Sequence, residues 1–326
     1  MIIVQYCQGL GNQMFQHALV MALRSKGYEV KADSRYLPKI NQGEGALTEI
    51  EAVFGISLLT ATTKEIMEIT ALGGREGIFK RLKCGFLNES ERYFKTNTYE
   101  NYVYLPSVFD KDNVYLQGHW FSEKYFTSIE DQIKTTFTFS NVDRKSQEIA
   151  NDYLGENSIS VHVRVYSDSN KQTSYKLRGY AKRTLGYDIG THTNAVTKEY
   201  YRKAKKYFDE RIIKPKYHIF TNNIQWCINN LEFNIKDYVT VNHTVHTTRK
   251  SGYLDAQYNN PIGKNHLDIY LMSQCKHHIV SNSSFAWWGA WLDSSESKIV
   301  LCPDRWFTNG YGATAFPDSW IRVSAV

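Results

Sequence analysis

Residues 278–292 read HIVSNSSFAWWGAWL, and the fold prediction starts from this stretch. The apolar run His278–Val280 predicts a buried strand, and Ser284–Leu292 predicts a helix that starts directly after it. The serines at the junction can cap that helix, whose first backbone N–H groups lack partners within the helix. These groups and the positive end of the helix dipole attract anions. The stretch is therefore either a cradle for a diphosphate or a capped helix with no ligand, and its tryptophans are expected in the core.

The same alternation of strand and helix extends on both sides of this stretch. Strands that alternate with helices form a parallel, doubly wound sheet with helices on both faces. The pattern predicts strands at Ile159–Val165, Tyr217–Phe220, Tyr238–Val241 and Lys298–Leu301, and helices at Thr197–Ile212, Ile224–Leu231 and Asn265–Cys275.

The N-terminal end of the chain predicts a second unit of the same kind. Met1–Val4 reads as a buried strand, Gln13–Lys26 as a helix with Asn12 as its N-cap, and Tyr28–Ala32 as a strand. The pattern weakens from Ile40 to Phe139, where a strand at Val114–Gly118 and a helix around Asp131–Lys134 are expected. With 326 residues the chain suits two domains. We place them at 1–152 and 153–326, with the boundary in the polar stretch 151–157.

Composition narrows the class of protein. Hydrophobic residues make up 42% of the chain, which is enough for a core, and the net charge of +6 is too small for a nucleic-acid footprint. The five cysteines are scattered without a CxxC pair, which favours a reducing compartment. No leader or membrane-spanning stretch is apparent. We expect a cytoplasmic protein that binds no nucleic acid, with peripheral association at the inner face of the membrane if the acceptor is lipid-linked.

Polar residues follow several of the predicted strands. They are Arg164, Thr221-Asn222-Asn223, Asn242-His243 and Ser281-Asn282-Ser283-Ser284. Because ligands bind at the carboxyl ends of parallel strands, this convergence predicts a ligand site. Alternation places Ser160, His162 and Arg164 on one face of their strand. An arginine at a buried strand end needs an anion, either a phosphate held by its fork of donors or a structural carboxylate.

The loop Gly9-Leu10-Gly11-Asn12-Gln13 lies between a strand and a helix, where glycines let the backbone approach a ligand. A dinucleotide fingerprint would need a third glycine at position 14, where this chain has Met14, although Asp33 lies where a ribose-binding carboxylate would. A nicotinamide-dependent oxidoreductase is therefore the alternative enzyme class, and a tight turn before a capped helix is the alternative without a ligand.

Three further features allow more than one interpretation. Asp268, one turn into its predicted helix, could bind a base or ribose or only favour the helix N-terminus. Asp110-Lys111-Asp112 matches the DxD tripeptide of metal-dependent glycosyltransferases, but the tripeptide is common and we expect no metal site. The basic stretch Asp168–Val196 is expected to be a lid after Arg164 rather than a nucleic-acid patch or a disordered insertion.

Taken together, several blocks resemble the bacterial α-1,2-fucosyltransferases of glycosyltransferase family 11. These are residues 9–16, His162-Val163-Arg164, residues 217–223, residues 268–273, residues 281–291 and residues 303–307. The resemblance covers nearly the whole chain. It implies an α/β fold of the GT-B type, with two Rossmann-like domains whose parallel sheets face a cleft. It also implies GDP-β-L-fucose as donor, a glycan acceptor on the N-terminal domain, and inverting transfer to O-2 of galactose without metal or cofactor.

The resemblance also implies roles for single residues. Arg164 would hold the leaving β-phosphate, and His162 and Asp168 would complete the catalytic group, with the general base open among His162, Asp168 and His17. One departure stands out, because the family reads His-x-Arg-Arg-Gly-Asp-Tyr where this chain has Val165 in place of the second arginine. A non-catalytic nucleotide-sugar or glycan-binding protein is therefore a third interpretation. The predicted donor-binding residues are Gly9, Gly11, Asn12, Asn222, Asp268, Asn282, Ser283, Ser284 and Phe285.

Overall fold

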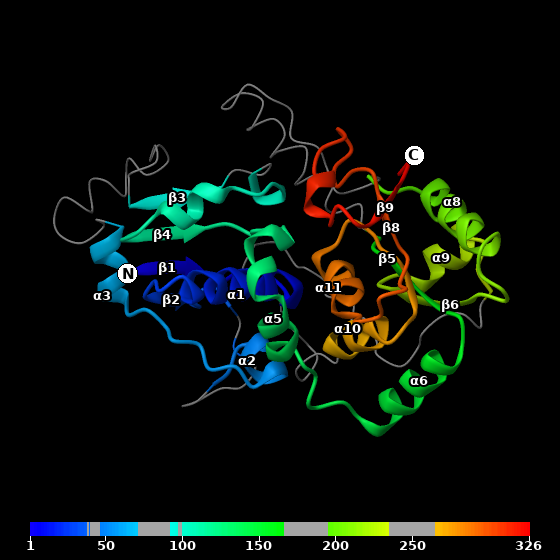
Figure 1. Ribbon diagram of the computed structural model, residues 1–326, viewed down its shortest axis with the longest axis horizontal. Helices are drawn as coiled ribbons and strands as arrows, with labels where there is room; N and C mark the ends of the chain where they lie inside the picture. The colour runs from blue at the N-terminus through cyan, green and yellow to red at the C-terminus, as the bar shows by residue number, and fades with distance from the viewer. Residues whose placement is uncertain (38, 40–45, 71–91, 97–99, 166–194, 235–264) are drawn as a thin grey trace. The chain divides into compact units, whose positions relative to one another are not determined.

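The computed structural model describes the 326-residue chain except residues 38, 40–45, 71–91, 97–99, 166–194 and 235–264 (Figure 1). The chain forms two compact units, Met1–Ser140 and Asn141–Val326, each described here by itself. The predicted boundary at 152/153 is therefore too late. The polar stretch that suggested a linker is the second half of helix α6 (Arg144–Gly155), which is capped by Asp143, buries Tyr153 and packs against α10.

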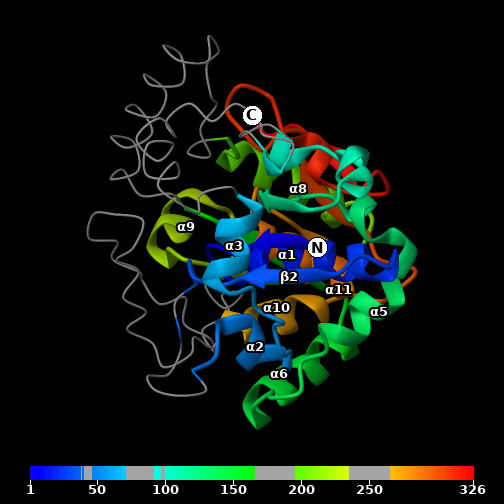
Figure 2. The ribbon, with the colours of Figure 1, turned by 90° about the vertical axis from the view of Figure 1, so that its left-hand side faces the viewer.

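Unit 1 contains a parallel sheet in the order β2-β1-β4-β3 (Figure 1). Its core comes from apolar strands such as β1, which is buried at every position. Helix α1 packs against β2 and α2 (Figure 2). The strands are β1 (Ile2–Gln5), β2 (Val30–Asp33), β3 (Tyr93–Lys95) and β4 (Val114–Gln117), and the α-helices are α1 (Leu10–Ser25), α2 (Glu49–Phe54), α3 (Thr63–Ile69) and α5 (Glu130–Thr136).

Unit 2 contains a second parallel sheet, in the order β6-β5-β7-β8-β9. The predicted strand Tyr238–Val241 lies outside the described residues, and the sequence missed β9. The strands are β5 (Ser158–Val163), β6 (Lys216–Thr221), β7 (His277–Ile279), β8 (Val300–Pro303) and β9 (Ile321–Val323); with α6, the helices are α8 (Lys198–Asp209), α9 (Ile224–Asn230), α10 (Asn265–Ser273) and α11 (Ser284–Leu292). Two parallel-sheet α/β units confirm the predicted pair of Rossmann-like domains.

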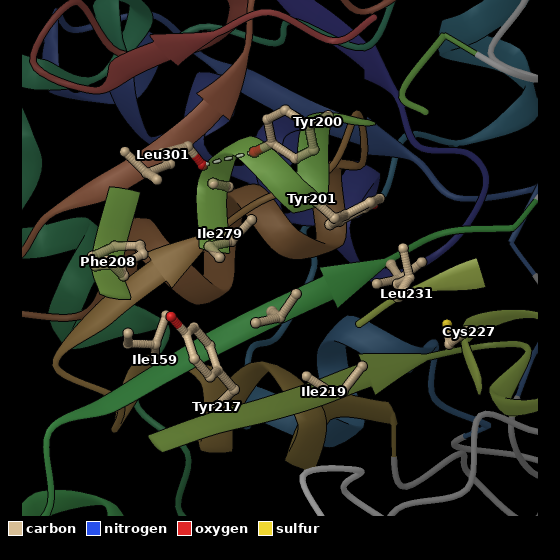
Figure 3. Packing of buried hydrophobic residues seen from close by; sticks show 13 residues of the cluster. Ile159, Tyr200, Tyr201, Phe208, Tyr217, Ile219, Cys227, Leu231, Ile279 and Leu301 are labelled. Atoms are coloured by element: carbon tan, nitrogen blue, oxygen red, sulfur yellow. Dashed lines mark hydrogen bonds between the residues drawn. The ribbon is translucent and has the colours of Figure 1, made fainter. Parts of the chain in front are cut away.

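The core of unit 2 lies between its strands and α8. Strand residues such as Val161, Ile219 and Ile279 pack with Tyr200 and Phe208 of the helix (Figure 3). The hydroxyl of Tyr200 is fully buried, and it donates to the carbonyl oxygens of Val280 at 2.6 Å and Leu301 at 3.0 Å. The helix is therefore joined to two adjacent strands near the edge where they end. No helix in the described part of the chain is long and apolar enough to span a membrane.

Candidate functional site

The order of strands in unit 2 indicates where a ligand binds. From β5 the chain places β6 on one side and β7 on the other, so the direction of winding reverses between β5 and β7. In open parallel sheets, ligands bind outside the carboxyl ends of the strands at such a reversal point. The residues that follow β5 and β7 are Arg164 and the stretch 280–284, so the two strongest candidates from the sequence flank the reversal point of unit 2.

Arg164 lies just beyond the end of β5 and is exposed. The expectation that β5 reaches Val165 and buries this arginine is therefore wrong, because the strand stops at Val163, two residues before the predicted end. The next residue, Val165, is held by a side chain that follows strand β6. The Val165 backbone N–H donates to Asn222 Oδ1 at 2.8 Å, and Asn222 Nδ2 donates back to the Val165 carbonyl at 2.8 Å. Asn222 thus fixes the backbone next to Arg164 rather than leaving its amide for a ligand.

His162 lies on the same face of β5 as Ser160, as the alternation predicted, and it is buried. Its Nδ1 lies 2.7 Å from the Ser281 hydroxyl, and its ring centroid lies 5.9 Å from that of Phe285. Burial, with a smaller effect of the Arg164 charge, lowers the pKa of His162 to about 3. The imidazole is therefore neutral at pH 7. The sequence analysis placed Ser281 in the polar stretch at the ligand site but missed its pairing with His162. The signal for this pair is a serine just after one strand and a histidine on the neighbouring strand.

Helix α11 begins at Ser284, as predicted, and Ser283 is its N-cap. The Ser283 hydroxyl accepts from the Phe285 N–H at 3.3 Å. Ser283, Ser284 and Phe285 are half-buried, so the first turn of the helix keeps surface for a ligand. Asn282 is buried, and its Nδ2 donates to the Trp306 carbonyl at 2.9 Å, which joins the turn before the helix to the segment after β8.

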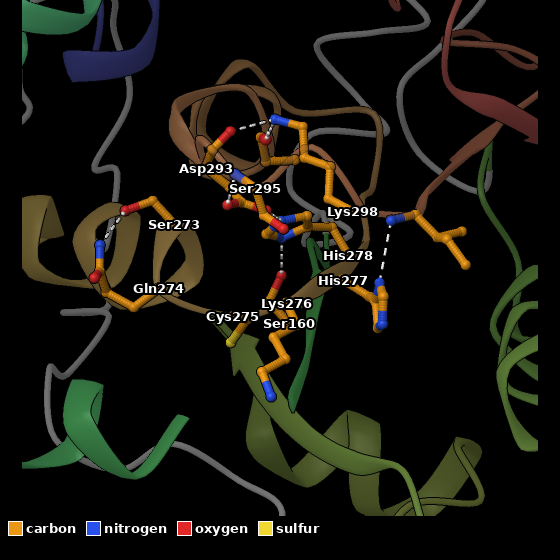
Figure 4. Close-up of polar contacts among 12 residues, drawn as sticks. Ser160, Ser273, Gln274, Cys275, Lys276, His277, His278, Asp293, Ser295 and Lys298 are labelled. Atoms are coloured by element: carbon orange, nitrogen blue, oxygen red, sulfur yellow. Dashed lines mark hydrogen bonds and ion pairs between the residues drawn. The ribbon is translucent and has the colours of Figure 1, made fainter. Parts of the chain in front are cut away.

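The opposite end of α11 is anchored in the core. Lys298 donates from Nζ to the last carbonyl groups of the helix, at 2.9 Å for Ala290, and so neutralises the negative end of its dipole. Asp293, the C-cap residue, lies 3.0 Å from His278 Nε2, and His278 Nδ1 lies 2.8 Å from the Ser160 hydroxyl (Figure 4). His278 is fully buried, so this chain of polar contacts links α11 through β7 to β5.

The tryptophans of α11 are core residues, as predicted. Trp287 and Trp288 have no exposed surface. Gly289 is also required by packing, because a Cβ there would lie 2.8 Å from Met272 of α10. Asp268 of the same α10 is buried, and α10 packs against α11. The close packing of α10 on α11 places Asp268 in the layer that supports the site, while Asp168, Asn242 and His243 lie outside the described residues.

The glycine loop of unit 1 is held together by its own polar residues. Helix α1 begins at Leu10 with Gly9 as its N-cap, so the prediction of Asn12 as N-cap is wrong. Asn12 donates from its backbone to the Gly9 carbonyl at 2.9 Å and from its side chain to Gln8. Gly9 is exposed, whereas Gly11 is buried in the first turn. This turn is more enclosed than the first turn of α11.

Two other candidates from the sequence have structural partners. Both carboxylate oxygens of Asp33 lie 2.8 Å from the Arg35 guanidinium, and Oδ2 also accepts from Tyr115. A ribose would have to compete with these bonds, which disfavours the nicotinamide alternative. Asp112 accepts from the Met1 amino group at 3.0 Å, and it precedes β4, so the DxD tripeptide lies at the amino edge of the sheet. Within the described residues no three His, Cys, Asp or Glu side chains group as a metal site; metal independence stays a prediction.

An exposed arginine, a half-buried helix start and a buried neutral histidine meet at the reversal point, and the first two are groups that attract anions. Comparison with known proteins shows which family the chain resembles. Residues 187–324 match Glycosyl transferase family 11. An Escherichia coli alpha-1,2-colitosyltransferase is 24% identical over 99% of this chain and 98% of its own length. The E. coli O-antigen biosynthesis glycosyltransferase WbnK is 27% identical over 97% and 98%. The chain is thus similar to glycosyltransferase family 11 over its C-terminal part, and to two bacterial glycosyltransferases over nearly its whole length.

Solved fucosyltransferase structures resemble the chain only distantly. The crystal structure of POFUT1 in complex with GDP aligns over 92% of this chain and 96% of that one, with 12% identity and a TM-score of 0.39. A similarity of this degree transfers no contact from one site to the other, so the roles of single residues rest on the geometry described above.

Proposed function

We propose that the protein transfers L-fucose from GDP-β-L-fucose to a hydroxyl of a glycan acceptor, O-2 of galactose, and forms an α-1,2 linkage with inversion. The observation that carries this proposal is the convergence of Arg164 and the start of α11 at the reversal point of unit 2. The family match over residues 187–324 and the two E. coli relatives support glycosyl transfer. Within this proposal, unit 1 binds the acceptor and unit 2 binds the donor.

In the proposed reaction the acceptor oxygen attacks C1 of fucose from the face opposite GDP. The C1–O bond to the β-phosphate breaks, its electron pair leaves with GDP, and the acceptor hydroxyl loses its proton. Negative charge grows on the diphosphate as the bond breaks. The Arg164 guanidinium and the positive end of α11 stabilise that charge without a metal ion, by the kind of fixed electrostatic interaction on which enzymes commonly depend.

The remaining predicted residues take supporting roles. Asp268 and Phe285 are assigned to the nucleoside, Ser283 and Ser284 to the diphosphate, and Asn222 to the backbone beside Arg164. A histidine with a pKa of about 3 is a weak base, so His162 is better suited to orienting Ser281 and Phe285 than to taking the acceptor proton. Asp168 keeps the role of general base in this proposal.

A second donor is favoured by one observation. The E. coli relative that matches 99% of the chain is named for colitosyl rather than fucosyl transfer. Colitose is L-fucose without its 3-hydroxyl, so the same nucleotide site and the same displacement would serve either sugar. The two donors differ in one hydroxyl group, and only a pocket that hydrogen-bonds that hydroxyl would reject colitose strongly.

Two assays test these proposals. Calorimetry with GDP, GDP-fucose and NAD should show binding of the first two alone; binding of NAD would favour the oxidoreductase. A glycan array incubated with GDP-fucose or GDP-colitose, with and without EDTA, should then show transfer to galactose-terminated glycans that EDTA leaves unchanged. Donor binding with neither transfer nor donor hydrolysis would identify a non-catalytic binding protein. A lipid-linked galactoside in vesicles tests the association with a membrane-bound acceptor.

A further inference from the structure

The sheet of unit 1 also has a reversal point. The chain places β2 on one side of β1 and β4 on the other, so the reversal lies between the carboxyl ends of β1 and β4. After β1 come Tyr6, Cys7 and Gln8, and after β4 comes the segment Gly118–Trp120. Gln16 of α1 joins the two strand ends, since its Nε2 donates to the Gly118 carbonyl at 3.2 Å and its Oε1 accepts from the Cys7 N–H at 3.0 Å.

Buried polar atoms without partners gather at this edge. Five buried side-chain polar atoms in the described part of the chain have no hydrogen-bond partner, and three of them are His119 Nδ1, His119 Nε2 and Trp120 Nε1. Buried polar groups in native proteins are nearly always paired, so each exception needs a reason. Two unpaired side chains next to each other at the reversal point indicate a site whose partner is a ligand.

The backbone around these atoms is fixed. The His119 N–H donates to Asn101 Oδ1 at 2.7 Å, and the His119 ring stacks on Phe121 with centroids 5.2 Å apart. A Cβ on Gly118 would lie 2.5 Å from Thr96 Oγ1, so only glycine fits there. Trp120 has a φ of +61°, a left-handed conformation that is costly for a bulky residue and is retained mainly at functional positions.

The unpaired nitrogens of His119 and Trp120 are uncharged donors and acceptors of the kind that bind hydroxyl groups. Burial lowers the pKa of His119 to about 4, so at neutral pH its ring is uncharged and offers one donor and one acceptor. The Trp120 indole adds a second donor. Uncharged donors and acceptors between aromatic rings suit the hydroxyl groups and C–H faces of a neutral sugar, whereas unit 2 presents a guanidinium and a helix N-terminus.

We propose that His119 and Trp120 bind hydroxyl groups of the neutral saccharide acceptor through the Trp120 indole N–H and one ring nitrogen of His119. The inference rests on the proposed function, because it assigns acceptor recognition within it. His119 keeps part of its surface exposed while its nitrogens are covered, so rotation of its ring brings one nitrogen to the acceptor. Both are binding residues, and Gln16 positions the segment that carries them.

Matched substitutions test the proposal by kinetics. His119→Phe keeps the ring on Phe121 and removes both nitrogens, and Trp120→Phe removes the indole N–H. Each should raise KM for the acceptor about tenfold, as expected for a lost hydrogen bond, while donor KM and acceptor-free donor hydrolysis stay at the wild-type level. His218→Phe is the control, because His218 also has a buried nitrogen without a hydrogen bond but lies in β6, with its ring tilted against that of Tyr153. An unchanged acceptor KM in folded variants would overturn the proposal.

A second measurement needs no turnover. In the wild-type protein, the indole N–H resonance of Trp120, assigned by its absence in Trp120→Phe or by sequential assignment, should shift when lactose or methyl β-galactoside is added and stay in place when GDP is added. A resonance that neither saccharide moves would refute the assignment. If the wild-type protein transfers no sugar from either donor, the proposed function fails while this titration still decides whether the segment binds saccharides.

Discussion

Two strand–turn–helix junctions at reversal points, β1–α1 in unit 1 and β7–α11 in unit 2, differ in how they use their polar residues. At the start of α1, Gln13 and Gln16 are fully buried and bond to the protein's own backbone. At the start of α11, Ser283 and Ser284 keep surface, and the helix is anchored from its other end. The comparison shows that a glycine-rich turn can be a structural joint, whereas a serine turn with its helix anchored elsewhere can receive a ligand.

The largest expected effect is on catalysis at the β5–β7 edge. Arg164→Ala should lower kcat about 10²–10³-fold, on the order of 3–4 kcal/mol, because it removes a positive group from the developing diphosphate charge. The free energy of unfolding should stay within about 0.5 kcal/mol, since Arg164 is exposed. Steady-state assays with GDP-fucose and urea unfolding measure the two quantities.

The control for this substitution is Arg144→Ala. Arg144 lies on α6 with a side chain that is 92% exposed and paired with Glu148. It should keep wild-type turnover, which would separate the role of Arg164 from a general loss of positive charge. Near-normal kcat in folded Arg164→Ala would remove Arg164 from the proposed mechanism.

At the β1–α1 junction, substitution should instead affect stability. Gln16→Leu would leave the Cys7 N–H and the Gly118 carbonyl without their partner, and we expect it to cost about 2–3 kcal/mol in the free energy of unfolding. Asn12→Ala, which removes a bond to the exposed Gln8, should cost less than about 0.5 kcal/mol. Urea unfolding checks both, and equal effects would contradict the view of Gln16 as the joint between β1 and β4.

The sequence predicted the β7–α11 junction better than the β1–α1 junction, because the residues that form β7–α11 are neighbours in the chain. The bounds of α11 follow from an apolar strand, a serine cap and an apolar helix, all adjacent in the chain. The partners of Gln16, in contrast, include Gly118, which lies more than a hundred residues away in the sequence. For Arg164, the alternation in β5 predicted which face the residue lies on but could not predict that its side chain is exposed. Strand β3, three residues long, and the polar helix α6 were missed because neither has a long apolar repeat.

A buried histidine lies at each junction, His17 within α1 and His162 on β5 against Ser281, and the two give a prediction for pH. His17 of α1 lies 2.9 Å from the Tyr6 hydroxyl, and burial lowers its pKa to about 4; the corresponding His162 has a pKa of about 3. Unfolded histidine titrates near 6.5, so the unfolded state binds more protons below that pH. The contribution of the neutral, buried histidines to the free energy of unfolding is therefore complete above pH 6.5. For His17 this contribution is lost as the pH falls towards 4.

Unfolding in urea at several pH values between 7.5 and 4.5 measures this dependence. Each buried histidine contributes a slope of at most about 1.4 kcal/mol per pH unit, so His17→Gln should flatten the curve by about that amount near pH 5. A curve with the same slope in His17→Gln would mean that His17 is protonated in the folded protein. Because the proposed function assigns the acceptor proton to Asp168, His17→Gln should leave the pH profile of kcat unchanged in the folded range.

The smallest expected effect distinguishes a cap from a ligand-binding residue at the start of α11. Glycine is nearly as good an N-cap as serine, and α1 already uses Gly9 in that position. Ser283→Gly should therefore change the free energy of unfolding by only a few tenths of a kcal/mol. If the Ser283 hydroxyl also binds the diphosphate, the same substitution should weaken GDP binding about threefold in calorimetry. Unchanged GDP affinity would reduce Ser283 to a cap, and the anion site at α11 would then consist of Arg164, Ser284 and the helix backbone.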